Sequence, residues 1–264
     1  MPEGDLLDSV GQRFERIGAA CKRALGGVSR IRSGPGKGLR FDAGLHTRRF
    51  ACGRYEIPVQ QALAALVRPG DVCCDIGANL GFFSILLGRL AGPSGSVYAF
   101  EPVPTNASTI ERNARLNRMR NIVVMEVALS GTDGEDELLL ARHVGGAVLR
   151  SAGTPPDLVG SAVVQTAALD TLLERQRVAP PDIVKIDVEG AEMEVLRGMD
   201  RTLRLRSPTI VLELDDATSA GCEKKTNSCQ SYLHDLGYRT TLLRNSYPDG
   251  QWFVAHVLAL GRRT

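Results

Sequence analysis

The sequence predicts an α/β fold in which one parallel sheet carries helices on both faces. Short apolar segments alternate with longer amphipathic ones from about residue 70 to residue 236, which is typical of parallel strands joined by helices. A glycine-rich turn at 77–81 ends the first apolar segment and opens a helix. The turn Tyr247-Pro-Asp-Gly250 joins the last two apolar segments and predicts a hairpin, so the last strand is antiparallel.

The elements follow from this alternation and from the glycine and proline positions between them. A helix at 55–66 should end at the Pro69-Gly70 turn. We then expect strands at 72–76, 96–101, 122–127, 183–187 and 209–214, and helices at 81–90, 105–117, 169–176, 191–199 and 227–236. Two further strands, 137–142 and 162–168, flank a Gly/Pro-rich loop, and strands at 238–244 and 252–260 finish the chain.

The chain divides into a short extension and one domain. At 264 residues it is long enough for a single buried core. Residues 1–50 are rich in Gly and Arg, with a flexible break at Ser33-Gly-Pro-Gly-Lys-Gly38, and form a helical or flexible extension. That extension could be a lid or a dimer arm, which leaves a homodimer open. Residues 51–264 contain the α/β domain.

Composition excludes several classes of partner. The 32 basic and 30 acidic residues give a formal charge of +2, which argues against a broad nucleic-acid surface. No run of 18 apolar residues exists, so no membrane partner is expected. The N-terminus lacks the apolar core of a secretory signal, so a cytoplasmic location is expected.

The glycine-rich turn indicates a nucleoside ligand without phosphate. The turn and the start of its helix comprise Gly77, Ala78, Asn79, Leu80, Gly81 and Phe82. It lacks the third glycine of the dinucleotide motif G-x-G-x-x-G. Asp75, just before the turn, would repel a pyrophosphate but suits an ammonium group. S-adenosylmethionine carries an ammonium, a sulfonium and a ribose, so the turn favours it over NAD.

A second carboxylate completes the expected pocket. Glu101 ends the strand at 96–101 and is followed by Pro102. An acidic residue at this strand end can accept hydrogen bonds from both ribose hydroxyls. Asp75 and Glu101 could instead only cap neighbouring backbone, but both fall at the expected strand ends of one unit.

Three more carboxylates are expected at the same sheet edge. Asp187 and Glu189 follow the strand at 183–187, and Glu213 ends the next strand. One could be the general base for an acceptor hydroxyl. Alternatively, Asp187 and Glu213 could hold Mg²⁺. Asp187 and Glu189 could also cap the following helix, and Lys185 should pair with a neighbouring carboxylate.

Histidines give no motif in this sequence. His143, in a Gly-rich loop, is the one alternative to the carboxylates as base, although a surface position is favoured. His256 alternates with apolar residues of the last strand and is expected to be structural.

Three motifs together resemble the FkbM family of S-adenosylmethionine-dependent methyltransferases. They are Asp75-Ile-Gly-Ala-Asn-Leu-Gly-Phe-Phe-Ser84, Phe100-Glu-Pro102 and Lys185-Ile-Asp-Val-Glu-Gly-Ala-Glu192. The resemblance runs from about Tyr55 to Glu213, and Gly53-Arg-Tyr-Glu56 also fits it. It implies the Rossmann-like seven-stranded sheet of class I methyltransferases and S-adenosylmethionine as cofactor. Its binding residues would include Glu56 and Asp187.

The resemblance also implies a small-molecule acceptor, often a hydroxyl of a sugar or a natural product of secondary metabolism. One position departs from the common methyltransferase pattern, because Val127 stands where an acidic residue often binds the adenine amine. We expect the adenine to pack against Val127 and to bond the backbone near Ala128.

The sequence therefore predicts an O-methyltransferase that uses S-adenosylmethionine. N-methylation on the same fold is an alternative. Two rivals come from other classes, since a fold alone does not decide function. An NAD-dependent oxidoreductase is disfavoured by the missing third glycine. A non-catalytic scaffold is disfavoured because it would not need the intact acidic and glycine positions.

Overall fold

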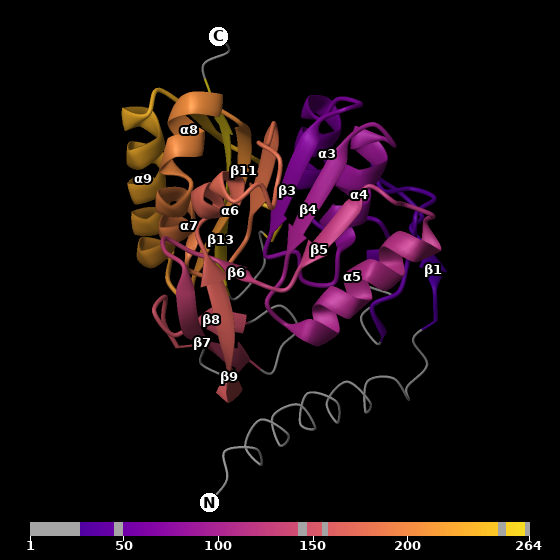
Figure 1. Ribbon diagram of the computed structural model, residues 1–264, viewed down its shortest axis with the longest axis horizontal. Helices are drawn as coiled ribbons and strands as arrows, with labels where there is room; N and C mark the ends of the chain where they lie inside the picture. Colours follow the sequence, from indigo (N-terminus) through magenta and orange to yellow (C-terminus); the bar gives the residue numbers. More distant parts are fainter. Residues whose placement is uncertain (1–26, 45–49, 142–146, 155–157, 248–251, 262–264) are drawn as a thin grey trace, which may run out of the picture.

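A seven-stranded sheet forms the centre of the protein (Figure 1). The computed structural model describes residues 27–44, 50–141, 147–154, 158–247 and 252–261. From one edge to the other, the strands are β12 (Arg239–Leu242), β13 (Phe253–Leu260), β11 (Thr209–Asp216), β10 (Ile183–Ile186), β3 (Val72–Ile76), β4 (Ser96–Phe100) and β5 (Ile122–Met125). Five neighbouring strands of this order are parallel to one another: β11, β10, β3, β4 and β5. The last strand, β13, is antiparallel to both neighbours, as predicted, and lies inside the sheet.

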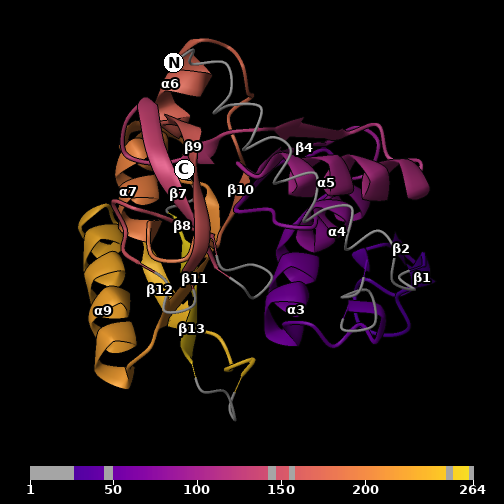
Figure 2. The same ribbon diagram turned by 90° about the horizontal axis from the view of Figure 1, so that it is seen from below.

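Helices cover both faces of this sheet (Figures 1 and 2). One face carries α3 (Ile57–Leu66), α4 (Phe82–Ala91) and α5 (Pro104–Leu116), and the other carries α6 (Leu169–Glu174), α7 (Glu192–Gly198), α8 (Asp200–Arg206) and α9 (Ser219–Asp235). Successive side chains of β3 alternate between the two cores, with Cys73 in the α3/α4 cluster and Cys74 in the α6–α9 cluster. This two-sided burial explains why the parallel strands are apolar throughout.

A second, smaller sheet lies beside the carboxyl ends of the large one. It has the order β6 (Ala128–Leu129), β9 (Leu158–Ala167), β7 (Gly134–Ala141) and β8 (Ala147–Leu149). Its core residues pack with Val103 and Ala191, which follow β4 and β10. The predicted extra pair of strands corresponds to β7 and β9, which are antiparallel, with Glu137 opposite Val163.

The segment predicted as a flexible break is a hairpin turn between β1 (Ser29–Arg30) and β2 (Arg40–Phe41). Gly38 N donates to Ile31 O at 2.8 Å, and Lys37 N donates to Gly34 O at 3.0 Å. The hairpin is fixed because Ile31 and Phe41 are buried against α4. Residues 1–26, which the prediction made helical or flexible, lie outside the described residues, so their role stays a prediction.

Two helices differ from the prediction. The prediction placed one helix over 191–199. The structure has α7 there and a second helix, α8, directly after it. α9 begins at Ser219 rather than near residue 227, because the Thr218 hydroxyl accepts from Gly221 N at 3.0 Å and caps the first turn. Of the helices that the described ranges contain, none is both long and apolar enough to cross a bilayer. The turn before β13 falls largely within 248–251, outside the described residues.

We predict that Asn113 stabilises the packing of the N-terminal hairpin on α5. Its Oδ1 accepts from Asp42 N at 2.9 Å, and its Nδ2 donates to Asp42 O at 3.1 Å and to Leu80 O at 3.0 Å. Asn113→Ala should lower the free energy of unfolding by about 1–3 kcal/mol for each buried group left unpaired, as measured by urea denaturation.

The control for this prediction is Asn117→Ala. Asn117 makes the equivalent pair of bonds to Arg40 N and O, but these bonds are exposed to solvent. Water can replace them, so the loss should stay at or below about 1 kcal/mol. Equal losses in the two variants would contradict a special role for the buried clamp.

Candidate functional site

The glycine turn brings the ends of β3, β4 and β10 into contact. Gly77 has φ 75°, and a Cβ at this position would lie 1.8 Å from the Asp187 carbonyl oxygen. Gly77 N and Ala78 N both donate to Phe100 O, at 3.1 and 3.0 Å. Gly81, with φ 84°, is the N-cap of α4. Only glycine at position 77 therefore allows this close approach of two strand ends.

Glu101 joins the glycine turn to the end of β4. Its Oε2 accepts from Asn79 N at 2.8 Å, and its Oε1 accepts from Val103 N at 3.0 Å and from Asn106 Nδ2 at 3.3 Å. Burial raises the pKa of Glu101 to about 7, although these hydrogen bonds lower it. Pro102 follows and is half-buried. A carboxylate held in this way is suited to accept ribose hydroxyls.

Asp75 lies beneath the turn and is fully buried. Its Oδ2 accepts from Ser84 Oγ at 2.6 Å, and its Oδ1 lies 4.0 Å from Lys185 Nζ. No described residue donates a hydrogen bond to Oδ1. Burial raises the pKa of Asp75, and Lys185 opposes that rise. The predicted contact of Asp75 with a ligand ammonium stays a prediction.

Lys185 forms the ion pair expected from the sequence. Its Nζ lies 2.8 Å from Asp187 Oδ2 and 4.9 Å from the centre of the Phe83 ring. Burial alone would lower the pKa of Lys185, but Asp187, Asp75 and Glu56 outweigh it and raise the pKa. Lys185 is therefore a buried cation that holds Asp187 at the sheet edge.

The Glu189 side chain interacts with Asp215 rather than joining the Lys185–Asp187 ion pair. Glu189 has φ 54°, and Asp215 accepts a hydrogen bond from the Trp252 indole. Burial and the neighbouring carboxylate of Asp187 raise the pKa of Glu189 to about 10. Glu189 and Asp187 do not cap α7, which has no side-chain cap.

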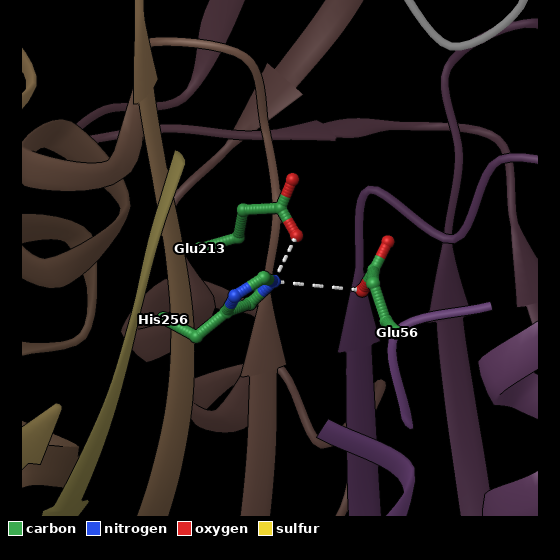
Figure 3. Close-up of side chains that lie close together, drawn as sticks. All are labelled: Glu56, Glu213 and His256. Carbon is green, nitrogen blue, oxygen red and sulfur yellow. Dashed lines mark hydrogen bonds and ion pairs between the residues drawn. The ribbon is translucent and has the colours of Figure 1, made fainter. Parts of the chain in front are cut away.

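Glu56, Glu213 and His256 form a buried cluster at the same edge (Figure 3). Glu213 Oε2 lies 2.7 Å from His256 Nε2, and Glu56 Oε2 lies 3.7 Å from the same nitrogen. The Tyr247 hydroxyl donates to Glu56 Oε1 at 2.6 Å. The antiparallel pairing of β11 with β13 sets Glu213 opposite His256.

The charges of this cluster depend on one another. Burial raises the pKa of Glu213 to about 8, with Asp187 adding to the rise. Burial would raise the pKa of Glu56 as well, but His256 and Lys185 lower it to about 2. Burial would lower the pKa of His256, whereas Glu213 and Glu56 raise it to about 9.

The place of His256 in this cluster was not predicted. His256 was expected to be a structural residue of the last strand, because the register of an antiparallel pair cannot be read from one strand. The polar His256 in an otherwise apolar strand was the available signal. His143 falls within 142–146, outside the described residues.

The predicted Mg²⁺ pair, Asp187 and Glu213, is not the cluster that the structure forms. Asp187 accepts from Lys185, and the described residues gather Glu56, Glu213 and His256 instead, with ligand atoms within 4.8 Å of one another. Mg²⁺ prefers oxygen ligands, so an imidazole in the cluster does not fit it.

The expected adenine region lies between the two sheets. β5 ends at Met125, and Ala128 opens β6. Val127 is half-buried and Glu126 is exposed. A flat base against Val127 remains the prediction for this position.

Comparisons with known proteins agree with the geometry. The family model described as the methyltransferase FkbM domain matches residues 75–240. The hexuronic acid methyltransferase AglP of Haloferax volcanii is 29% identical over 152 residues, which cover 57% of this chain and 59% of that protein. The 31-O-demethyl-FK506 methyltransferase FkbM of Streptomyces tacrolimicus is 28% identical over 181 residues, which cover 58% of this chain and 69% of that protein.

Solved structures share the fold. A methyltransferase FkbM from Methylobacillus flagellatus KT aligns with TM-score 0.50 and 15% identity, over 76% of this chain and 50% of that one. Aeropyrum pernix fibrillarin, solved with S-adenosylmethionine, aligns with TM-score 0.51 and 15% identity, over 90% and 83%. The predicted Rossmann-like class I methyltransferase sheet is thereby confirmed. Since the family match spans more than half of the sequence and includes the glycine turn, the chain belongs to the FkbM family of methyltransferases.

Proposed function

We propose that the protein transfers the methyl group of S-adenosylmethionine to a hydroxyl oxygen of a small molecule. The observation that carries this proposal is the Glu101 clamp, which holds a buried carboxylate against the glycine turn through Asn79 N and Val103 N. A carboxylate at this strand end can accept hydrogen bonds from the ribose hydroxyls. The family of the chain and the carboxylates at the adjoining edge supply the rest of the argument.

The donor half of the site would use the ends of β3, β4 and β5. The residues proposed to bind S-adenosylmethionine are Glu56, Asp75, Gly77, Ala78, Asn79, Gly81, Phe82, Glu101, Pro102, Val127, Ala128 and Asp187. In this arrangement Glu101 accepts the ribose hydroxyls, and the base lies toward Val127. The missing third glycine and the adjacent carboxylates disfavour the pyrophosphate of NAD.

The acceptor half would use the carboxylates Asp187, Glu189 and Glu213. Of these, we assign the proton transfer to Asp187, which pairs with the Lys185 cation. The pKa values of Glu189 and Glu213 are raised to about 10 and about 8, so both carboxyls hold a proton near neutral pH and cannot accept another. Bound S-adenosylmethionine would supply an activated methyl group: the acceptor oxygen would bond to the methyl carbon while the carbon–sulfur bond broke, with the electron pair of that bond left on sulfur. Asp187 would take the hydroxyl proton. Alignment can supply ~7–11 kcal/mol of the barrier reduction.

A small-molecule acceptor is supported by the names of two relatives, a hexuronic acid methyltransferase and a 31-O-demethyl-FK506 methyltransferase. The match covers 59% of the first relative's length, so its acceptor is not carried over to this chain. N-methylation is the alternative within the same fold. The expected cytoplasmic location and the possible homodimer stay predictions.

The first test is cofactor binding by isothermal titration. S-adenosylmethionine should bind one to one, and NAD should not bind. Glu101→Gln should lower the affinity for S-adenosylmethionine by about tenfold to one hundredfold, because a charge-assisted hydrogen bond contributes about 1.5–3 kcal/mol to binding. Glu111→Gln, an exposed carboxylate on α5, is the matched control. NAD binding, or equal affinities of the Glu101 and Glu111 variants, would overturn this assignment.

Cofactor affinity should also depend on pH. The pKa of Glu101 is raised to about 7, so below this pH the carboxyl is protonated and loses acceptor capacity. Affinity of the wild type for S-adenosylmethionine should therefore fall as the pH is lowered from 8 to 6, by isothermal titration at each pH. The part of the dependence due to Glu101 should vanish in Glu101→Gln. Parallel pH profiles of the two proteins would contradict this account.

Removal of the proposed base should lower turnover more than binding. Asp187→Asn should reduce kcat by about 10²–10⁴-fold, measured with labelled cofactor and the acceptor found in a screen of hydroxylated metabolites. Thermal melting and cofactor titration check folding, since Lys185 loses its ion-pair partner. If kcat is unchanged in a folded variant, Asp187 is not the base.

A further inference from the structure

The carboxyl edge of the sheet carries an excess of buried negative charge on its α3/α4 face. The ionisable side chains that interact there are Asp75, Asp187, Glu56, Glu213, Lys185 and His256. Lys185 neutralises one carboxylate, and His256 neutralises at most one more, even when it is protonated. In formal charges, two carboxylates in this set remain without a cation. Such an excess is costly in a region from which water is largely excluded.

With His256 protonated, one of these two unneutralised carboxylates belongs to the cluster of Glu56, Glu213 and His256. The side chains of Glu56 and His256 are each 1% exposed, and that of Glu213 is 15% exposed. Glu56 Oε2 faces His256 Nε2, but no described residue gives it a hydrogen bond. A buried carboxylate oxygen that has no hydrogen-bond partner and lies beside two other ligand atoms is a place where an ion or a water would be held.

The spacing of the three ligand atoms fits a metal ion. Ligands about 2.0–2.2 Å from a common ion lie roughly 3–3.5 Å from one another. The distances from His256 Nε2 to Glu213 Oε2 and to Glu56 Oε2 are 2.7 and 3.7 Å and bracket that range. Small side-chain rotations would therefore bring the three atoms around one centre.

We propose that Glu56, Glu213 and His256 bind a divalent transition-metal ion such as Mn²⁺ or Zn²⁺. One imidazole with two carboxylates is a donor set for Mn²⁺, Fe²⁺ or Zn²⁺ rather than for Mg²⁺ or Ca²⁺. Binding requires His256 Nε2 without a proton, so the ion replaces that proton as the charge between the two carboxylates. The rival arrangement is a protonated His256 shared by Glu213 and Glu56 with no metal.

The place of the ion suggests its use. Lys185 pairs with Val211 across β10 and β11, and Glu213 lies two residues further on, level with Asp187. An acceptor hydroxyl beside Asp187 could complete the coordination and become more acidic. This role rests on the proposed function, whereas the metal binding does not. A failed activity assay with intact metal binding would therefore count against the function alone.

Metal binding can be tested on the wild-type protein. After dialysis against a chelator, Mn²⁺ is titrated and the free ion is followed by electron paramagnetic resonance, because thiols compete poorly for Mn²⁺. One Mn²⁺ per chain should bind, and a large excess of Mg²⁺ should not displace it. Zn²⁺ should shift the Nε2 resonance of His256 in protein carrying ¹⁵N-labelled histidine, which identifies the ligand without a mutation.

Variants separate this site from other carboxylates and histidines. Loss of a residue that only hydrogen-bonds a metal ligand lowers metal affinity by about 10–100-fold. Glu213→Gln and His256→Gln each remove a proposed ligand, so each should lower the affinity for Mn²⁺ by more than that. Glu101→Gln, a buried carboxylate at the same edge, and His234→Gln, an exposed histidine, should bind Mn²⁺ like the wild type. An absence of stoichiometric Mn²⁺ and Zn²⁺ binding to the wild type would overturn the proposal. So would binding unchanged in folded His256→Gln, or a His256 resonance that Zn²⁺ leaves in place.

Discussion

The buried ammonium of Lys185 is the constraint on which the site depends. It lies 2.8 Å from Asp187, 4.0 Å from Asp75 and 4.9 Å from the Phe83 ring, and so it links the ends of β3 and β10 with the start of α4. Removing one partner of a buried ion pair costs about 3–5 kcal/mol. The glycine turn must therefore close over a charged centre. Gly77, which has room for no side chain against Asp187, allows the two strand ends to meet.

This arrangement separates the edge into two halves with different chemistry. On the β4 side, Glu101 holds the turn through backbone amides, and burial raises the pKa of its carboxyl to about 7. On the β11 side, Glu213 and His256 are bound to each other rather than to backbone. The first half is built like a binding pocket. The second is built from groups that exchange protons or hold a cation.

The sequence predicted which side chains meet on the β4 side of the edge better than on the β11 side, for a physical reason. Asp75, Gly77 and Glu101 lie within one short β-α-β unit, where local spacing determines which side chains meet. Glu56 and His256 are 200 residues apart in numbering and meet only through the position of β13 between β11 and β12. That register is a property of two strands together. The start of α9 was also misplaced, because its cap depends on Thr218, a polar residue outside the apolar pattern.

The family match covers the two halves of the edge unequally. The family match over 75–240 includes Asp75, Glu101 and Asp187, but neither Glu56 nor His256. The match therefore covers most of the residues proposed to hold the methyl donor, and it also includes Glu213 of the proposed metal site. Glu56 precedes α3 and His256 lies on the last strand, so both reach the edge from segments outside the match. The two halves of the edge are still connected electrostatically, because Lys185 lowers the pKa of Glu56 and Asp187 raises the pKa of Glu213.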